Sequence, residues 1–82
     1  MTKFYLVTIN DQCGDCYNDK GFFKKEDAIN YCYNEVKNDR RLKEWYIDEG
    51  LTDITFEQYV KNMLREDMYI EETIGIEEIT VT

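Results

Sequence analysis

Two cysteines three positions apart are the residues best able to do chemistry in this chain of 82 amino acids. Cys13 and Cys16 form a CxxC motif, whose spacing allows two thiolates to bind one metal ion or to close a small disulfide ring. A structural zinc site needs four ligands, and only Cys32 and a nearby carboxylate, Asp15 or Asp19, could complete it. A thioredoxin-like pair would lie at the start of a helix, whereas the segment after Cys16 is typical of a turn. Three interpretations therefore stay open: a hairpin tip without special chemistry, a zinc site at Cys13, Cys16 and Cys32, or a thiol-active pair.

The remaining chemistry is limited by the absence of histidine. Histidine is the side chain that titrates near neutral pH and the commonest ligand of transition metals. The paired carboxylates Glu26 and Asp27 fall in the first turn of an expected helix, where they complement the helix dipole and need no catalytic role. We therefore expect a protein that is not an enzyme and that requires no cofactor.

Acidic residues are concentrated in the second half of the chain. Residues 1–41 carry seven acidic and seven basic side chains, whereas residues 42–82 carry eleven acidic and three basic ones, which accounts for the whole formal net charge of -8. Such a surface repels nucleic acid, because binding to phosphates requires cations. It attracts a basic surface on another protein. The alternative is that the acids only keep the surface solvated. The residues expected to bind a partner are Glu44, Asp48, Glu49, Glu66, Asp67, Glu71 and Glu72.

Strands are predicted at both ends of the chain. Residues 3–9 (KFYLVTI) are β-branched and aromatic and are apolar on both faces, which indicates a central strand. We expect a loop over residues 10–20 and a short return strand at residues 21–23. Residues 69–81 alternate in two phases, which predicts a last strand with a bulge near Glu77 and Glu78.

Three helical segments are predicted between these strands. The first begins near Lys24 and buries Ala28, Ile29, Cys32, Tyr33 and Val36. The pattern then restarts in a new phase with Leu42, Trp45 and Tyr46, and Gly50 is expected to cap this helix. Trp45 is expected in the core. The third helix begins at the capping box formed by Thr55 and Gln58.

Together these elements predict an α+β fold. A small, mainly antiparallel sheet of about three strands is expected, in the order strand, strand, helix, helix, helix, strand, with the helices packed on one face. Residues 1–82 are expected to form a single domain, because the chain is short and 43% of it is hydrophobic. No segment has the length of a membrane helix, and Met1 to Thr8 lack a signal-peptide pattern, so we expect a cytoplasmic protein.

The segments KFYLVTIN, GFFKKEDAINY and YIEETIGIEEITV carry a resemblance. Their layout resembles small uncharacterised accessory domains of phages and Gram-positive bacteria, over about half of the chain. The middle of the chain, from Asp39 to Asp67, departs from that pattern by extra helical sequence. The resemblance implies a phage or mobile-element protein acting in the host cytoplasm, and it supplies no catalytic residue.

These observations lead to a functional hypothesis and two rivals. The hypothesis is a non-catalytic inhibitor that binds a host nucleic-acid-binding or defence protein through its acidic surface, as a DNA mimic or in the manner of an anti-CRISPR protein. It predicts no direct contact with nucleic acid or membrane. The rivals are a small CxxC protein that binds metal or uses its thiols, and a structural or oligomerisation module, such as a homodimer, whose sheet edges pair between copies.

Overall fold

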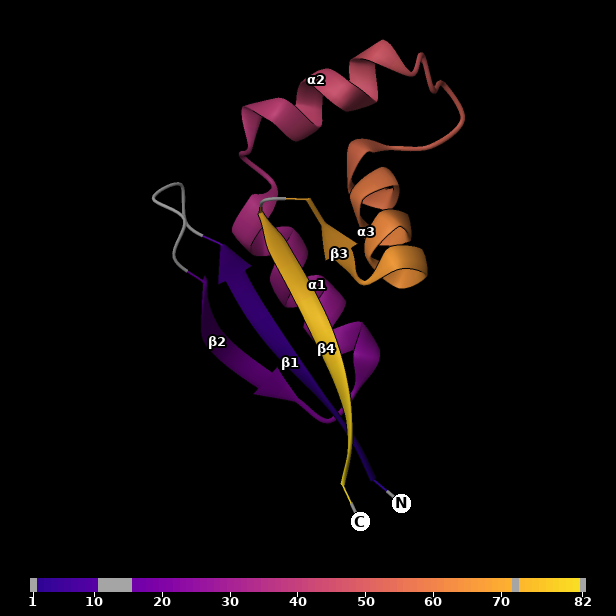
Figure 1. The fold of residues 1–82 in the computed structure, drawn as a ribbon. Coiled ribbons are helices and arrows are strands. Elements are labelled where there is room, and N and C mark those ends of the chain that lie inside the picture. Colours follow the sequence, from indigo (N-terminus) through magenta and orange to yellow (C-terminus); the bar gives the residue numbers. More distant parts are fainter. Residues whose placement is uncertain (1, 11–15, 72, 82) are drawn as a thin grey trace.

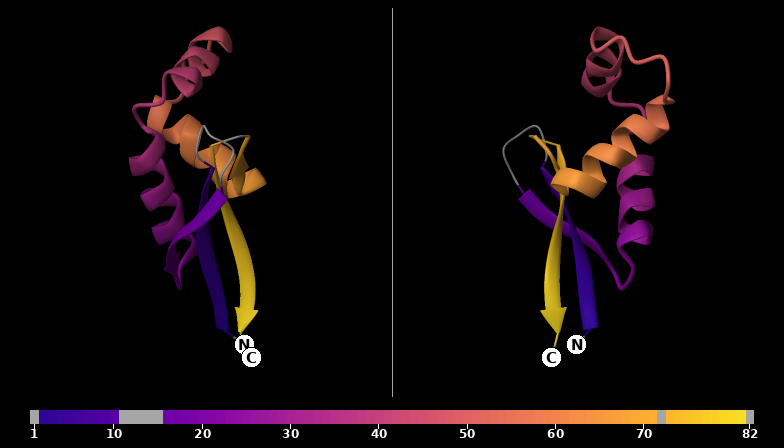
Figure 2. Two further views of the ribbon diagram at one scale, coloured as in Figure 1. Left: turned by 60° about the vertical axis from the view of Figure 1, so that its left-hand side comes forward. Right: turned by 90° about the vertical axis from the view of Figure 1, so that its right-hand side faces the viewer.

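The computed structural model describes residues 2–10, 16–71 and 73–81. Four described strands form one antiparallel sheet in the order β2-β1-β4-β3. Helices α1 and α3 lie on one side of this sheet, and α2 lies beyond one end of it (Figures 1 and 2). This architecture confirms the α+β fold and the pairing of the last strand beside the first. The elements are β1 (Thr2–Asn10), β2 (Cys16–Phe22), α1 (Lys25–Val36), α2 (Arg40–Asp48), α3 (Phe56–Asp67), β3 (Tyr69–Ile70) and β4 (Ile74–Val81).

The hydrophobic core lies between the sheet and the helices. Alternate residues of β1 and β4 point into it, as expected for strands with a period of two, and so does the apolar stripe of each helix. Cys32 is part of this core, with no exposed surface. The buried residues are Tyr5, Val7, Ala28, Ile29, Cys32, Val36, Leu42, Tyr59, Val60, Leu64, Ile70, Ile74 and Ile76.

The helix boundaries follow the local signals in the sequence. The Asp39 side chain accepts hydrogen bonds from the backbone N–H groups of Arg41 and Leu42, so α2 begins as a new helix after α1. Gly50 follows α2 with a φ of 64°, a backbone conformation that favours glycine. Thr55 and Gln58 form both hydrogen bonds of the predicted capping box. Trp45 is half-buried at the edge of the core instead of fully inside it.

The tail of the chain differs from the prediction. Met68 ends α3 in the left-handed conformation, and β3 then pairs with β4, with Ile70 opposite Ile74. Within β4 the two phases of the tail are the two faces of one strand: Ile74 and Ile76 point into the core, and Ile79 and Val81 lie on the opposite face. The hairpin of β3 and β4 was not predicted from this alternation. The bulge expected near Glu77 and Glu78 is wrong, because β4 pairs with β1 in an unbroken register from Val81 to Ile74.

Strand β2 is longer than predicted. It begins at Cys16, opposite Asn10, so the expected loop over residues 10–20 is wrong for residues 16–20. Its register with β1 shifts by one residue between Val7 and Thr8, which is a β-bulge. The polar composition of residues 16–20 concealed this strand, because an edge strand needs less apolar surface than a central one.

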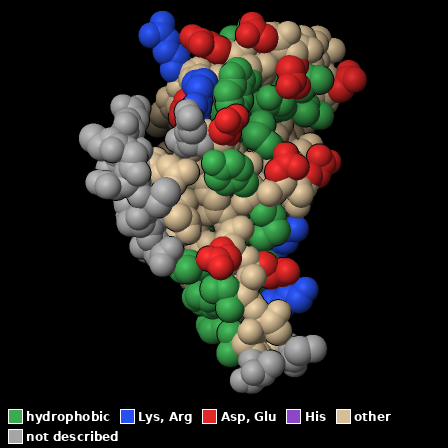
Figure 3. Space-filling model, viewed as in Figure 1, with side chains coloured by type: hydrophobic (Ala, Val, Ile, Leu, Met, Phe, Trp, Pro, Cys, Tyr) green, Lys and Arg blue, Asp and Glu red, His purple; other side chains and the backbone are tan. Residues whose placement is uncertain are grey.

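The second face of the sheet is covered by none of the described helices. By alternation with the buried residues of β1 and β4, this face carries Phe4, Leu6, Ile79 and Val81. The ring of Phe4 lies directly over Gly21, where a Cβ atom would collide with the Cζ atom of the ring. Figure 3 shows hydrophobic side chains gathered over the lower end of the sheet. We refer to this side of the sheet as the open face.

Candidate functional site

Five of the seven acidic residues singled out in the sequence lie in two groups. Glu44 and Asp48 lie on α2, one helical turn apart and on the same side, and Glu49 follows at its C-terminal end. Glu66 and Asp67 form the second group, in the last turn of α3. All of these side chains are exposed. Figure 3 shows acidic side chains spread over α2, α3 and the adjacent upper part of the sheet.

Helix α3 connects the two groups. The Tyr59 hydroxyl, near the start of α3, donates a hydrogen bond to the Glu49 carboxylate at 3.3 Å. From Tyr59 to Asp67 the helix rises by about 12 Å, at 1.5 Å per residue. The structure therefore links the first group to α3 through Glu49 but does not bring the two groups into a single cluster. Burial of the phenol, and then the negative charge of Glu49, raise the pKa of Tyr59.

Arg41 ties α2 to the turn that contains Glu71. Its Nη2 atom donates a hydrogen bond to the backbone oxygen of Glu71 at 2.7 Å and another to the Thr73 hydroxyl. Its guanidinium also lies over the Trp45 ring, 5.0 Å from the centroid. Glu71 is exposed beside this anchor. Glu72 lies outside the described residues.

The exposed carboxylates of the three helices differ in whether their positions in the fold are favourable. Asp48 lies in the last turn of α2, and Glu66 and Asp67 lie in the last turn of α3. The negative end of the helix dipole is there, so each acid costs stability. Glu26 is the opposite case. It lies in the first turn of α1 and binds Arg65, whose Nε is 2.8 Å from its Oε1, and this hydrogen bond lowers the pKa of Glu26.

Exposed hydrophobic side chains accompany the acidic groups. Ile47 and Leu51 flank Asp48 and Glu49, and they are 71% and 37% exposed. Tyr69, directly after α3, is 48% exposed. We did not expect these three residues to be functional, because apolar residues at helical or strand spacing are more often buried. The signal available in the sequence was the position of Ile47 outside the stripe that contains Leu42 and Trp45.

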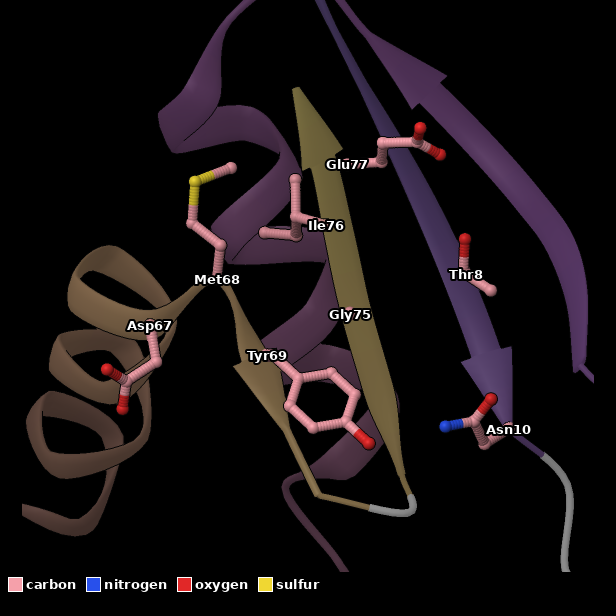
Figure 4. Close-up of a pocket in the computed structure, with 8 residues that line it drawn as sticks. All are labelled: Thr8, Asn10, Asp67, Met68, Tyr69, Gly75, Ile76 and Glu77. Atoms are coloured by element: carbon pink, nitrogen blue, oxygen red, sulfur yellow. The ribbon is translucent and has the colours of Figure 1, made fainter. Parts of the chain in front are cut away.

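A pocket of about 330 Å³ lies between the end of α3 and the open face. The Tyr69 ring lies across Gly75, where a Cβ atom would come within 3.1 Å of its Cδ2 atom. In Figure 4 the side chain of Asp67 lies on one side of this ring and that of Asn10 on the other. The pocket is open to solvent and joins the second acidic group to the open face. It is lined by Thr8, Asn10, Asp67, Met68, Tyr69, Gly75, Ile76 and Glu77.

The cysteine motif lies mostly outside the described part of the chain. This is true of Cys13 and of the side chain of Cys16, so the CxxC hypothesis stays a prediction. The third proposed ligand, Cys32, is a core residue of α1. Among the described residues, no three histidine, cysteine, aspartate or glutamate side chains come close enough together to hold a metal ion.

Membrane-spanning helices are absent from the described ranges, because every helix there is too short and too polar to span a bilayer.

Comparison with known proteins adds no relative. No model of a known protein family, no curated protein and no solved structure matches this chain. The candidate site therefore rests on the two acidic groups, the exposed hydrophobic residues beside them and the adjoining pocket.

Proposed function

We propose that this protein is a non-catalytic protein-binding module. In this proposal the acidic groups on α2 and at the end of α3 bind a basic surface of another protein. The partner is a nucleic-acid-binding or defence protein of a bacterial host, and the module is a phage-type inhibitor that occupies the partner's nucleic-acid site. Direct binding to nucleic acid is not part of the proposal, since the chain carries a net charge of -8.

The observation that carries this proposal is the position of three acids at the C-terminal ends of helices. Asp48, Glu66 and Asp67 lie where the helix dipole disfavours negative charge. Solvation alone needs charge somewhere on the surface, and it does not need acids at these unfavourable positions. Residues that break a local rule of stability are often kept for function. A basic partner would supply the missing cations.

The exposed hydrophobic residues add a second line of support. The centre of a protein interface is enriched in apolar and aromatic side chains that a polar rim surrounds. Ile47 and Leu51 have acids beside them, and Tyr69 lies two residues from Asp67. These side chains would contact the apolar part of the partner, while the carboxylates steer its approach.

Affinity capture tests the proposal. The tagged protein would be incubated with lysate of a Gram-positive bacterium at low and at high salt, and bound proteins identified by mass spectrometry. We expect capture of a basic nucleic-acid-binding protein at low salt, with most of it lost at high salt. The captured protein, once purified, should release a DNA or RNA probe when this protein is added. Absence of that competition would contradict the inhibitor mechanism.

A matched pair of variants separates specific binding from net charge. Glu66→Lys/Asp67→Lys reverses the acidic end of α3, and it should reduce capture at least tenfold. Asn30→Lys/Asn34→Lys/Glu35→Lys changes the net charge by the same amount on exposed positions of α1. Figure 2 shows α1 on the covered side of the sheet. This control should still bind; equal loss in both variants would mean that only net charge matters.

A further inference from the structure

Strand β4 has an open edge over most of its length. Strand β3 pairs with it only at Ile74 and Gly75, and Met68 adds one further hydrogen bond, from the N–H of Ile76 to the Met68 oxygen at 2.8 Å. Beyond Ile76, residues 77–81 pair with β1 on one side and with none of the described residues on the other. In Figure 1 this part of β4 extends past the helices together with β1.

The backbone groups along this edge are oriented outward. In an antiparallel strand, consecutive residues direct their N–H and C=O groups to opposite sides. Ile76 directs its N–H toward Met68, away from β1, so Glu78 and Thr80 also direct theirs away from β1. A strand with two such residues is a template for another extended segment.

The opposite edge of the sheet is less suited to pairing. Strand β2 carries the bulge opposite Val7 and Thr8, and bulges twist an edge away from regular pairing. Strand β4 is regular, with an unbroken register along β1 from Val81 to Ile74. An incoming strand therefore fits β4 better than β2.

We propose that two copies of this chain pair through the open edges of their β4 strands, antiparallel and centred on Ile79. In this register Glu78 of each copy exchanges both backbone hydrogen bonds with Thr80 of the other, which satisfies the outward groups. Glu77 faces Val81 of the other copy. The proposal does not depend on the proposed function, because it uses a different part of the molecule.

The charges and the length of the edge favour this register over its neighbours. Centring the pair on Glu78 would set two Glu78 carboxylates directly opposite each other, and it would direct Val81 toward Gly75, which already pairs with Tyr69. Centring it on Thr80 would pair only residues 79–81 among those described. The register centred on Ile79 uses the whole segment 77–81. Within one chain, the Lys3 ammonium lies 3.5 Å from the Glu78 carboxylate, and Lys3 is the neighbour of Thr80 across the strands. In this register the Glu78 of the second copy also pairs with Thr80, so Lys3 and that Glu78 lie on the same face, on either side of Thr80.

The pairing would bury apolar side chains mainly on the open face. Phe23 packs edge-on against Phe4, with centroids 5.4 Å apart, and Phe4 lies opposite Ile79. Pairing sets Ile79 against Ile79 of the second copy, so the apolar side chains form one continuous band across both sheets. Ile79 is half-buried and Val81 is 48% exposed in the single chain, and both would lose exposed surface.

Mass measurement by light scattering tests the proposal. At micromolar concentrations we expect twice the chain mass of 9.9 kDa. Thr80→Pro removes one outward N–H and no hydrogen bond to β1, and it should give the single-chain mass with the fold retained by circular dichroism. Phe23→Lys, which changes the open face away from the β4 edge, should keep the double mass. A parent protein of single mass would overturn the proposal.

Charge pairing at Ile79 tests the register itself. Ile79→Lys and Ile79→Glu each place two like charges across the symmetry axis, so each should have the single-chain mass. Mixing the two variants should restore the double mass, because opposite charges then face each other. Single variants that stay dimeric, or a mixture that stays monomeric, would contradict a pair centred on Ile79.

Discussion

At the scale of single residues, this protein places charges that its fold does not require. Glu66 and Asp67 lie at the negative end of α3, whereas Glu26 binds Arg65 across two helices. Both kinds of acid are exposed, and they differ in their position along the helix and in the ion pair with Arg65. The acids that reduce stability are therefore the best candidates for function.

Reversing these acids should make the protein more stable. We expect Glu66→Lys and Asp67→Lys each to raise the free energy of unfolding by about 0.3 to 1 kcal/mol, because a cation suits the C-terminal end of a helix. Urea denaturation measures this change. Glu57→Lys is the matched control at the other end of α3, where Glu57 binds Lys61 at 3.2 Å, and it should lower the stability. A loss of stability in Glu66→Lys would contradict the dipole argument.

Tyr59 should make the stability fall at high pH. Burial and Glu49 raise the pKa of its phenol, so the folded state favours the neutral form. The resulting stabilisation is complete below the ordinary tyrosine pKa of about 10 and is lost as the pH rises through the higher folded value. Tyr59→Phe should therefore lose less stability than the parent above about pH 10.

Glu49→Gln is the companion variant for this titration. Removing the negative charge should lower the pKa of Tyr59 toward its ordinary value, which NMR titration of the tyrosine ring carbons measures. An unchanged pKa would mean that burial alone causes the shift. The hydrogen bond from Tyr59 to Glu49 would then contribute little to the position of the first acidic group.

At the scale of elements, α2 contributes few fully buried side chains. Leu42 is its one fully buried side chain among the described residues, and Asp39 and Arg41 supply the polar anchors at its start. Trp45 and Tyr46 are half-buried against the core, and the outer side of α2 presents acids and Ile47 to solvent. A helix attached in this way positions a binding surface while adding little to the core.

Truncating Leu42 should therefore loosen α2 and the acids that it carries. We expect Leu42→Ala to cost about 2 to 5 kcal/mol, from lost burial and a cavity. Ile47→Ala removes a similar side chain from an exposed position of the same helix and should change stability by less than about 0.5 kcal/mol. Urea denaturation and amide hydrogen exchange of α2 measure both effects. Equal costs would show that Ile47 packs as a core residue.

The elements also show where sequence patterns suffice and where they do not. The capping box predicted the start of α3, because a cap is a local contact. The start of α2 was predicted only from the new phase of its apolar residues, and its cap at Asp39 was not predicted. The hairpin of β3 and β4 was missed. Its first strand begins directly after Met68, which ends α3 in the left-handed conformation, and no local preference of methionine indicates that conformation. The first part of β2 was missed because pairing with β1, and not its own composition, makes it a strand.

At the scale of the whole molecule, helices cover one side of the sheet and leave the other open. The apolar residues on both faces of β1 correctly indicated a central strand, but central position does not imply that both faces are covered. The acidic half of the chain was visible in the sequence. Its division into two groups was not, because the distance between them depends on how α3 packs.

The central claim is that the acids at the end of α3 are kept for a partner at a cost to the fold. Affinity capture with Glu66→Lys/Asp67→Lys, beside the triple-lysine control on α1, tests it most directly. The account predicts that the α3 variant is more stable than the parent and captures at least tenfold less of the basic partner, while the control captures it normally. Undiminished capture by the stable α3 variant would contradict the account.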